Sequence, residues 1–368
     1  MQQRVVVVGG GYGGAAVAKE LDDVAEVVLV EPKDAFVHAV GALRAVVDVD
    51  WQEQLFYPYD GLLARGRVVH DWARLVQPGK VSLSSTETLD ADHVVLATGT
   101  GYPFPAKFLE DEAAVARTHL ARLRQDLARC ERVVLVGGGP VGLELAGELT
   151  SAFPDLAVTV VDRAHDILTV GDFLPELRES VREQLADRGV TFVVGAPLGY
   201  LPPTDVGTYG DFHVETMAGA PVDGQMWFRC YGSRPMTDYL DAELSNGKHY
   251  DGTLPVTPHL NLVGQDRVWA VGDITAVVES KRASAARDHA TVVVQNIKDA
   301  LEGRAPSATY APAPELIVLP LGPEGGASQV TGEDGTRTVL GAAETSAIKG
   351  QDLFSSAIAD LFGVSGRA

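Results

Sequence analysis

The chain has little cysteine, and its two cysteines stand far apart. Cys130 and Cys230 form no CxxC or CxxxxC pair, and this absence excludes an electron relay through a disulfide between neighbouring cysteines. The low cysteine content also fits a reducing, cytoplasmic compartment. No cluster of His, Cys and carboxylate residues has the spacing of metal ligands, so we predict that the protein holds no metal.

Basic residues are scarce. Lys and Arg together number 30 against 50 Asp and Glu, so the formal net charge is -20. Such a surface repels the phosphates of nucleic acids, which argues against a nucleic-acid partner. It also disfavours adsorption to anionic membranes by charge. If the protein binds a phosphate-bearing cofactor, local backbone dipoles rather than a basic surface must hold it.

No apolar run is long enough to span a bilayer. The N-terminus leads directly into an apolar run without a signal peptide, and Gln2 stands where N-myristoylation needs a glycine. We expect a cytoplasmic protein, at most weakly peripheral at the inner face of a membrane. Residues 351–363 carry an apolar helical stripe, which either contacts a membrane or packs against the body or a second subunit of a homodimer. The stripe consists of Leu353, Phe354, Ala357, Ile358, Leu361 and Phe362.

A nucleotide-binding fingerprint is present near the N-terminus. Residues 4–8 read as a buried parallel strand, and Gly9, Gly11 and Gly14 follow it and open an Ala-rich helix. The first glycine permits the turn, the second lets the backbone approach a pyrophosphate, and the third allows close packing of helix and strand. Glu31 ends the next strand about 20 residues on, where a carboxylate accepts hydrogen bonds from a ribose.

The same plan returns later in the chain. A strand over residues 132–136 precedes Gly137, Gly139 and Gly142, and Asp162 ends the strand that follows the next helix. Two complete fingerprints are far more specific than one. The alternative for the first is a tight structural turn, and the alternative for the second is a decayed second fold that binds nothing. The sequence therefore predicts an α/β protein with two Rossmann-like, doubly wound domains, the second inserted in the first, plus a small C-terminal region.

Two further segments favour FAD in the first domain. A strand ends in Ala97-Thr98-Gly99, and a later one ends in Gly272-Asp273. Together with both fingerprints, in this order, they resemble the flavoprotein family with two dinucleotide-binding domains. The resemblance implies that Asp273 holds the ribityl chain of FAD. We expect an FAD domain of residues 1–105 and 254–308, an NAD(P)H domain of 106–253 and a C-terminal region of 309–368.

The resemblance extends to one branch of that family. Residues 31–38 (EPKDAFVH) followed by 42–45 (ALRA), then residues 103–108 (PFPAKF) and the late Lys349-x-x-Asp352-Leu353-Phe354 are similar to the ferroptosis-suppressor branch of apoptosis-inducing-factor-like proteins. This implies an FAD-dependent oxidoreductase that passes hydride from NADH or NADPH to the flavin and electrons on to a quinone-type acceptor. On this basis Lys33 and Arg44 are expected to contact the cofactor; an ion pair is the alternative for Arg44.

Three side chains are candidates for the chemistry. Glu144 stands at the family position where a Glu orients the nicotinamide, and Lys349 resembles the lysine that approaches the flavin and could stabilise negative charge on it. His289 follows the Gly-Asp turn on a helix and could serve as an acid or base in quinone reduction. The alternatives are a solvated helix Glu, a surface Lys and a packed helix His.

Other functions share these features. A type II NADH dehydrogenase of the respiratory membrane would use the same cofactors, and an NADH:ferredoxin-type reductase would dock an iron–sulfur protein. A non-enzymatic NADH-sensing flavoprotein of the apoptosis-inducing-factor type is a further alternative.

The sequence departs from the pattern of this flavoprotein family in one place, because Arg229-Cys230-Tyr231-Gly232 replaces the second domain's Ala-Thr-Gly.

Overall fold

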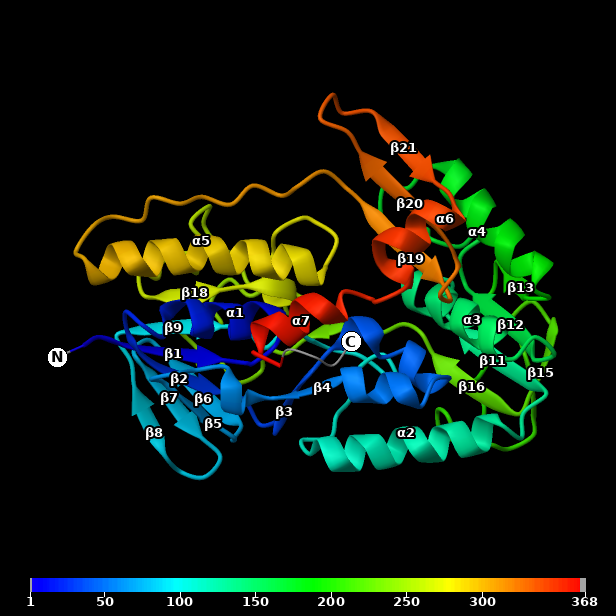
Figure 1. The fold of residues 1–368 in the computed structure, drawn as a ribbon, viewed down its shortest axis with the longest axis horizontal. Coiled ribbons are helices and arrows are strands. Elements are labelled where there is room, and N and C mark those ends of the chain that lie inside the picture. The colour runs from blue at the N-terminus through cyan, green and yellow to red at the C-terminus, as the bar shows by residue number, and fades with distance from the viewer. Residues whose placement is uncertain (1, 365–368) are drawn as a thin grey trace.

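The computed structural model describes residues 2–364. The last four residues of the expected C-terminal region and Met1 lie outside this range. The chain forms two parallel sheets, each covered on both faces, and a smaller C-terminal unit (Figure 1). The predicted α/β class with two Rossmann-like domains is confirmed.

The first sheet combines strands from both ends of the chain. Its order is β18-β9-β1-β2-β5, and all neighbouring strands are parallel. Alternate valines of β1 face opposite sides: Val5 and Val7 pack under α1 and α5, whereas Val6 and Val8 face the antiparallel sheet β6-β7-β8. This double burial explains why β1 reads as a continuous apolar run. The elements are β1 (Arg4–Val8), α1 (Tyr12–Leu21), β2 (Glu26–Val30), β5 (Arg67–Val69), β6 (Ala73–Gln77), β7 (Lys80–Leu83), β8 (Thr88–Asp90), β9 (His93–Leu96), β18 (Val268–Ala270) and α5 (Ala283–Leu301).

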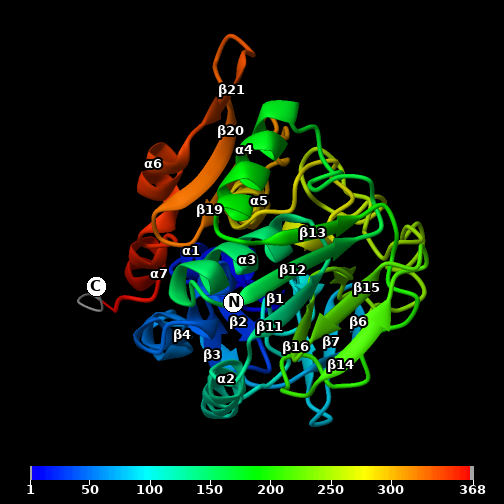
Figure 2. The ribbon, with the colours of Figure 1, turned by 90° about the vertical axis from the view of Figure 1, so that its right-hand side faces the viewer.

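The second sheet has the parallel order β13-β12-β11-β16. Figure 2 shows this sheet with α3 and α4 on one side and the hairpin β14–β15 on the other. A short antiparallel pair, β10 with β17, lies where the chain passes between the two sheets. This topology supports the domain boundaries that we propose, at residues 105 and 254. The elements are β10 (Thr100–Gly101), α2 (Ala113–Leu127), β11 (Arg132–Val136), α3 (Pro140–Ala152), β12 (Ala157–Asp162), α4 (Pro175–Asp187), β13 (Thr191–Val194), β14 (Phe212–Glu215), β15 (Pro221–Gly224), β16 (Met226–Arg229) and β17 (Arg234–Pro235).

The C-terminal unit joins the two halves. Its antiparallel sheet β19-β20-β21 packs on α3 and α4, and the chain then turns back to the first domain through α6, a π-helical turn and α7. Short elements β3 and β4 pair near α7, and single 3-10 turns connect several strands. The bounds are β3 (Ala35–Val37), β4 (Phe56–Pro58), β19 (Ile317–Leu321), β20 (Gly325–Thr331), β21 (Arg337–Leu340), α6 (Ala342–Thr345), the π-helical turn (Ser346–Gly350) and α7 (Ser355–Leu361), with 3-10 turns at Ala39–Gly41, Arg44–Val46, Asp50–Gln54, Tyr59–Gly61 and Gly272–Ile274.

The apolar stripe of residues 351–363 mostly faces the protein interior. Leu353, Ile358 and Phe362 are buried, and the Phe362 ring packs against three aromatic rings of the first domain. Phe354 and Ala357 are exposed, and Leu361 is only partly buried. The packing interpretation is therefore confirmed for Leu353, Ile358 and Phe362, whereas weak membrane contact through the exposed part of the stripe stays a prediction. No helix among the described residues is long and apolar enough to cross a bilayer.

A buried histidine ties this C-terminal segment to the first glycine loop. His38 Nε2 donates to the carbonyl of Leu353 at 2.9 Å, so in the neutral ring Nδ1 accepts from the Tyr12 hydroxyl, also at 2.9 Å. The hydroxyl accepts in turn from the Val40 N–H. Burial lowers the pKa of His38 to about 4.

We therefore expect acid sensitivity from His38. Its folded pKa lies below the ordinary value of about 6.5, so the unfolded chain takes up a proton first, and stability present above pH ~6.5 is lost as the pH falls towards 4. His38→Gln keeps an N–H donor for Leu353 and cannot be protonated. Melting temperatures measured from pH 7 to 4 should fall more steeply for the wild type than for this variant. Parallel curves would contradict the assignment.

Candidate cofactor and redox site

The first glycine loop has the shape that a dinucleotide needs. Gly9 has φ +102°, and a Cβ on it would lie 2.6 Å from the carbonyl oxygen of Ala97, so only glycine fits this turn. A Cβ on Gly14 would overlap the carbonyl oxygen of Gly9. Around Gly11, in contrast, no atom lies within 4 Å of the Cβ position. The loop is thus packed below and open at the helix N-terminus, where a pyrophosphate would approach.

Glu31 braces this loop from the end of β2. Its Oε2 accepts the N–H of Gly10 at 2.6 Å and its Oε1 accepts the N–H of Lys33 at 3.0 Å. Burial raises the pKa of Glu31, and the two N–H donors act against that rise. Each oxygen keeps further acceptor capacity for a ribose hydroxyl. Lys33 Nζ donates a hydrogen bond to the carbonyl oxygen of Glu110 at 2.6 Å.

The second loop repeats this geometry. Gly137 has φ +120°, and its Cβ would lie 2.6 Å from the carbonyl oxygen of Cys230; a Cβ on Gly142 would overlap the carbonyl oxygen of Gly137. The Cβ position of Gly139 is open, like that of Gly11. Asp162 accepts the N–H of Gly138 at 2.6 Å, as Glu31 does for Gly10. The two predicted fingerprints therefore form two glycine loops of the same geometry. We call the loop at residues 9–14 the first cradle and the loop at residues 137–142 the second cradle.

The backbone of the Arg229-Cys230-Tyr231-Gly232 segment has a conformation similar to that of the Ala97-Thr98-Gly99 segment. The carbonyl of Cys230 backs Gly137 as that of Ala97 backs Gly9, and Gly232 and Gly99 both have positive φ, at +97° and +62°. Only the side chains depart from the pattern. In the first domain, the Thr98 hydroxyl is bound to the Met236 carbonyl at 2.6 Å and lies 2.9 Å from the Tyr239 hydroxyl.

Asp273 lies beside Lys107, a residue that no sequence motif marks as part of the site. Its Oδ2 accepts the Thr100 hydroxyl at 2.9 Å, and Lys107 Nζ lies 3.8 Å from the same oxygen. The ammonium also donates to the carbonyl and hydroxyl of Thr100. Burial lowers the pKa of Lys107, and Asp273 opposes that shift. The sequence does not connect Lys107 with Asp273, because 166 residues separate the two and no local pattern relates them.

The structure brings Glu144 and Lys349 together. Lys349 Nζ lies 2.8 Å from Glu144 Oε1, and both side chains are largely buried. Glu144 is on α3, two residues past Gly142, whereas Lys349 belongs to the π-helical turn. Neither side chain is the solvated surface residue of the alternative interpretations. The pair joins the second domain to the C-terminal unit beside the second glycine loop.

Arg44 makes a second contact at the same junction. Its Nε donates to Glu148 Oε2 at 2.7 Å, and its guanidinium also donates to the Gly350 carbonyl at 2.8 Å. Burial raises the pKa of Glu148, and Arg44 opposes the rise. Arg44 therefore forms an ion pair, the alternative to the cofactor contact expected from the sequence. Through Glu148 and Gly350 it links the first domain to the second domain and to the C-terminal unit.

His289 is completely buried, and both ring nitrogens face protein atoms. Nδ1 accepts the N–H of Gly272 at 3.0 Å, and Nε2 lies 2.9 Å from Glu279 Oε1. The carboxylate oxygen lies off the direction of the N–H bond, so this second contact is electrostatic rather than a well-aligned hydrogen bond. Burial lowers the pKa of His289. Its position matches the packed-helix alternative rather than direct contact with an electron acceptor.

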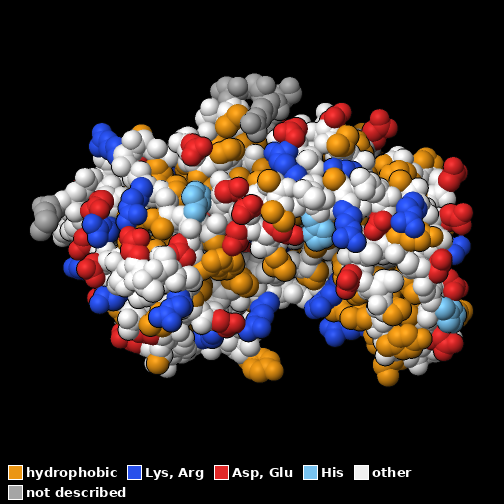
Figure 3. Space-filling view, turned by 90° about the horizontal axis from the view of Figure 1, so that it is seen from below, with side chains coloured by type: hydrophobic (Ala, Val, Ile, Leu, Met, Phe, Trp, Pro, Cys, Tyr) orange, Lys and Arg blue, Asp and Glu red, His pale blue; other side chains and the backbone are white. Residues whose placement is uncertain are grey.

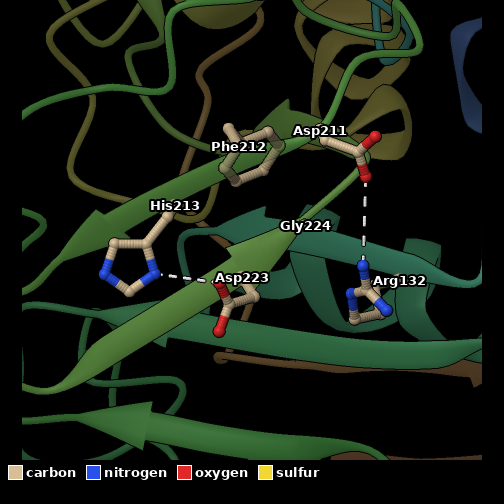
Figure 4. A pocket seen from close by; sticks show the side chains of 6 residues that line it. All are labelled: Arg132, Asp211, Phe212, His213, Asp223 and Gly224. Carbon is tan, nitrogen blue, oxygen red and sulfur yellow. Dashed lines mark hydrogen bonds and ion pairs between the residues drawn. The ribbon is translucent and has the colours of Figure 1, made fainter.

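Figure 3 shows a notch between the two lobes with Lys and Arg side chains along its rim. One surface pocket, in contrast, lies away from the second glycine loop. The shallow pocket in Figure 4 is lined by Arg132, Asp211 and His213, among others. Arg132 begins β11 and Gly137 follows its end, so this pocket lies at the opposite end of the strand from the second cradle. Among the described residues no group of His, Cys, Asp and Glu could hold a metal ion.

Comparison with known proteins agrees with this architecture. A model of the pyridine nucleotide-disulphide oxidoreductase family matches residues 3–290. Ferroptosis suppressor protein 1 of Taeniopygia guttata is 33% identical over 363 residues, covering 96% of this chain and 94% of that protein. Apoptosis-inducing factor homolog A of Dictyostelium discoideum is 26% identical over 89% of this chain and 85% of that protein. The sulfide:quinone oxidoreductase of Aquifex aeolicus superposes with a TM-score of 0.75 at 16% identity, over 99% of this chain and 93% of that one.

Two sheets with paired glycine cradles define a flavoprotein with two dinucleotide-binding domains. The chain belongs to the pyridine nucleotide-disulphide oxidoreductase family. It is an FAD-dependent oxidoreductase that uses NAD(P)H. Its residues fit these cofactors, because each cradle leaves an open helix N-terminus for phosphates and a carboxylate at the following strand end. Unlike the disulphide enzymes that give the family its name, it has two free cysteines.

Substitutions of Gly11 and Gly14 should have different effects on FAD binding and on the stability of the fold. Gly11→Ala places its methyl group in open space, so the fold should keep its melting temperature while FAD affinity falls by at least about tenfold, since the methyl stands where phosphate approaches. Gly14→Ala collides with the Gly9 carbonyl and should destabilise the apoprotein itself. Thermal melts of apoprotein and fluorescence titration with FAD measure both effects. Equal melting losses in the two variants would contradict this division of roles.

Proposed function

We propose that the protein is an NADH-preferring NAD(P)H:quinone oxidoreductase. The observation that carries the proposal is the Glu144–Lys349 ion pair, which places the two residues expected to serve the nicotinamide and the flavin in direct contact. The resemblance to the ferroptosis-suppressor branch supports the quinone acceptor. The bound cofactors supply the redox chemistry, in which NAD(P)H gives hydride to FAD and the flavin passes electrons to the acceptor.

The residues assigned to cofactor binding follow from the two cradles. Glu31 and Asp162 are the strand-end carboxylates for the two riboses, and Asp273, held by Thr100 and near Lys107, is the carboxylate for the ribityl chain. Around each cradle the backbone supplies the phosphate contacts, as the net charge of -20 requires. The remaining assigned residues are Gly9, Gly11, Gly14, Lys33, Ala97, Thr98, Gly99, Gly137, Gly139, Gly142 and Gly272, with Arg44 bracing the junction through Glu148.

Glu144 and Lys349 have complementary roles. In the ion pair each neutralises the other, which lowers the cost of placing both side chains in a largely buried position. The Glu144 carboxylate can accept hydrogen bonds from a carboxamide on one side, and the Lys349 cation can stabilise negative charge on the other. Because both groups are fixed by the same contact, a substrate that engages one of them also affects the other.

The acceptor is tested by reoxidation. Protein reduced anaerobically with NADH is mixed in a stopped-flow instrument with a panel of quinones, with oxygen and with ferredoxin, and flavin absorbance is followed. Fast reoxidation by quinones supports the proposal. Reoxidation only by ferredoxin favours a ferredoxin-type reductase, and a reduced protein that persists with every acceptor favours the NADH sensor. Retention on liposomes during turnover separates a membrane dehydrogenase from an enzyme that acts away from the bilayer.

Glu144→Gln should slow flavin reduction by NADH by on the order of 100-fold, because a misplaced nicotinamide loses its alignment with the flavin. FAD content should stay unchanged, since Glu144 lies on α3 directly after the second glycine loop rather than the first. Glu179→Gln on the exposed face of α4 serves as the matched control. The rate is measured in a single turnover with saturating NADH. A wild-type rate in Glu144→Gln would remove Glu144 from the reaction.

We expect at least roughly tenfold higher kcat/KM for NADH than for NADPH, about 1.4 kcal/mol. Asp162 stands where the 2′-phosphate of NADPH would lie, and its charge is fixed there by the amides of Gly138 and Ala164. Asp162→Asn removes the charge, keeps an acceptor oxygen and should narrow the gap. Arg163, exposed next to it, pulls the other way, so Arg163→Ala should harm NADPH more than NADH. Equal use of both cofactors by the wild type would show that Arg163 offsets Asp162.

A further inference from the structure

A buried chain of contacts connects the linker after α5 with the turn that carries Asp273. Tyr310 lies in residues 302–316, which run along α5 towards β19 in Figure 1. Its hydroxyl donates to Glu279 Oε2 at 2.5 Å, and the other oxygen of Glu279 lies 2.9 Å from His289 Nε2. The Tyr310 ring also meets the imidazole edge-on at 4.2 Å between centroids. His289 Nδ1 then accepts the N–H of Gly272.

The last of these contacts holds a demanding turn. Gly272 has φ +74°, and its Cβ position is 3.3 Å from the side chain of Ala286 on α5. The Gly272 carbonyl accepts from both the N–H and the hydroxyl of Thr275, so the residue is tied on both sides. Asp273 follows directly and points to Thr100. A change at the Gly272 N–H is therefore passed to the carboxylate next to it.

We propose that His289 is a positioning residue for the flavin: its unprotonated Nδ1 fixes the Gly272–Asp273 turn, and Glu279 and Tyr310 hold the ring in place. This rests on the proposed assignment of Asp273 to the ribityl chain. The Nδ1 atom accepts the Gly272 N–H only in the neutral ring, because a protonated imidazole has no acceptor. Protonation of His289 thus releases the turn and weakens the hold on FAD.

The surrounding charges act on the ring in opposite directions. Glu279 and Asp288, the latter on α5 itself, favour the protonated form, whereas burial and Lys281 favour the neutral one. Burial is the largest effect, so the ring stays neutral near pH 7. The Lys281 ammonium is held near His289 by hydrogen bonds to the carbonyls of Thr275 and Val277. FAD affinity should therefore be constant near pH 7 and fall only when the pH drops below the lowered pKa of His289 in the apoprotein.

Two amide substitutions distinguish the roles of the two ring nitrogens. His289→Asn places an oxygen near the Nδ1 position and can still accept the Gly272 N–H, whereas His289→Gln places its amide near Nε2 and leaves that N–H without a partner. We expect FAD affinity, measured by fluorescence titration of the apoprotein at pH 7.5, to fall on the order of tenfold in His289→Gln. It should stay within about threefold of the wild type in His289→Asn, whose affinity should also be flat between pH 7.5 and 5.5.

Glu279→Gln and Tyr310→Phe keep the histidine and test its neighbours. Removing the Glu279 charge disfavours the protonated ring, so FAD retention should extend to lower pH than in the wild type. Tyr310→Phe leaves Glu279 with one donor fewer, and loss of FAD should begin at higher pH. A purely structural role predicts losses in both variants at every pH.

Equal loss of FAD in His289→Asn and His289→Gln, or a wild-type pH profile in Glu279→Gln, would overturn the proposal. These titrations need no electron acceptor, so a failure of the quinone assignment leaves them unaffected. Failure of the wild type to bind FAD would instead refute the flavoenzyme assignment. If both His289 variants are unfolded by circular dichroism, the opposite pH shifts of Glu279→Gln and Tyr310→Phe decide.

Discussion

The interaction on which both halves of the protein depend is a strand-end carboxylate bound to the middle of a glycine loop. Glu31 holds Gly10 and Asp162 holds Gly138, each through a 2.6 Å hydrogen bond from a backbone N–H. This hydrogen bond restrains a glycine-rich loop, whose backbone would otherwise have more conformational freedom than the rest of the βαβ unit. The loop leaves the helix N-terminus open at Gly11 and at Gly139, and a protein of net charge -20 needs such local dipoles to hold phosphates.

The C-terminal unit then fixes the two cradles relative to each other. Within five residues of chain, Lys349 pairs with Glu144 of the second domain, the Gly350 carbonyl binds Arg44 of the first domain, and the Leu353 carbonyl binds His38 beside the first cradle. Arg44 in turn reaches Glu148 on α3. These contacts are buried and polar, so their geometry is more specific than that of apolar packing alone. A hinge between the domains would have to break them together.

Local patterns made the cradles predictable, whereas contacts between distant segments were not. The glycines, Glu31 and Asp162 lie within about 25 residues of each other in each fingerprint, so spacing alone defined them. The association of Lys107 with Asp273 depends on β9 and β18 being neighbours in the sheet, which no local signal reveals. For Arg44 the sequence allowed a cofactor contact or an ion pair, and only the fold showed that Glu148 was within reach. The stripe of residues 351–363 has the same periodicity whether it faces a membrane or a core, and the rings that cover Phe362 come from residues 36–59.

The absence of a redox disulfide shapes the rest of the site. Burial raises the pKa of Cys130 to about 11 and that of Cys230 to about 12, so both remain thiols at neutral pH. Cys230 instead serves as packing, with its carbonyl behind Gly137. Lys107 and Lys349 are partly buried and each lies beside a carboxylate, so we propose that they balance charge that changes during electron transfer. In a strongly acidic protein such local pairs, rather than the overall surface, set the electrostatics of the reaction.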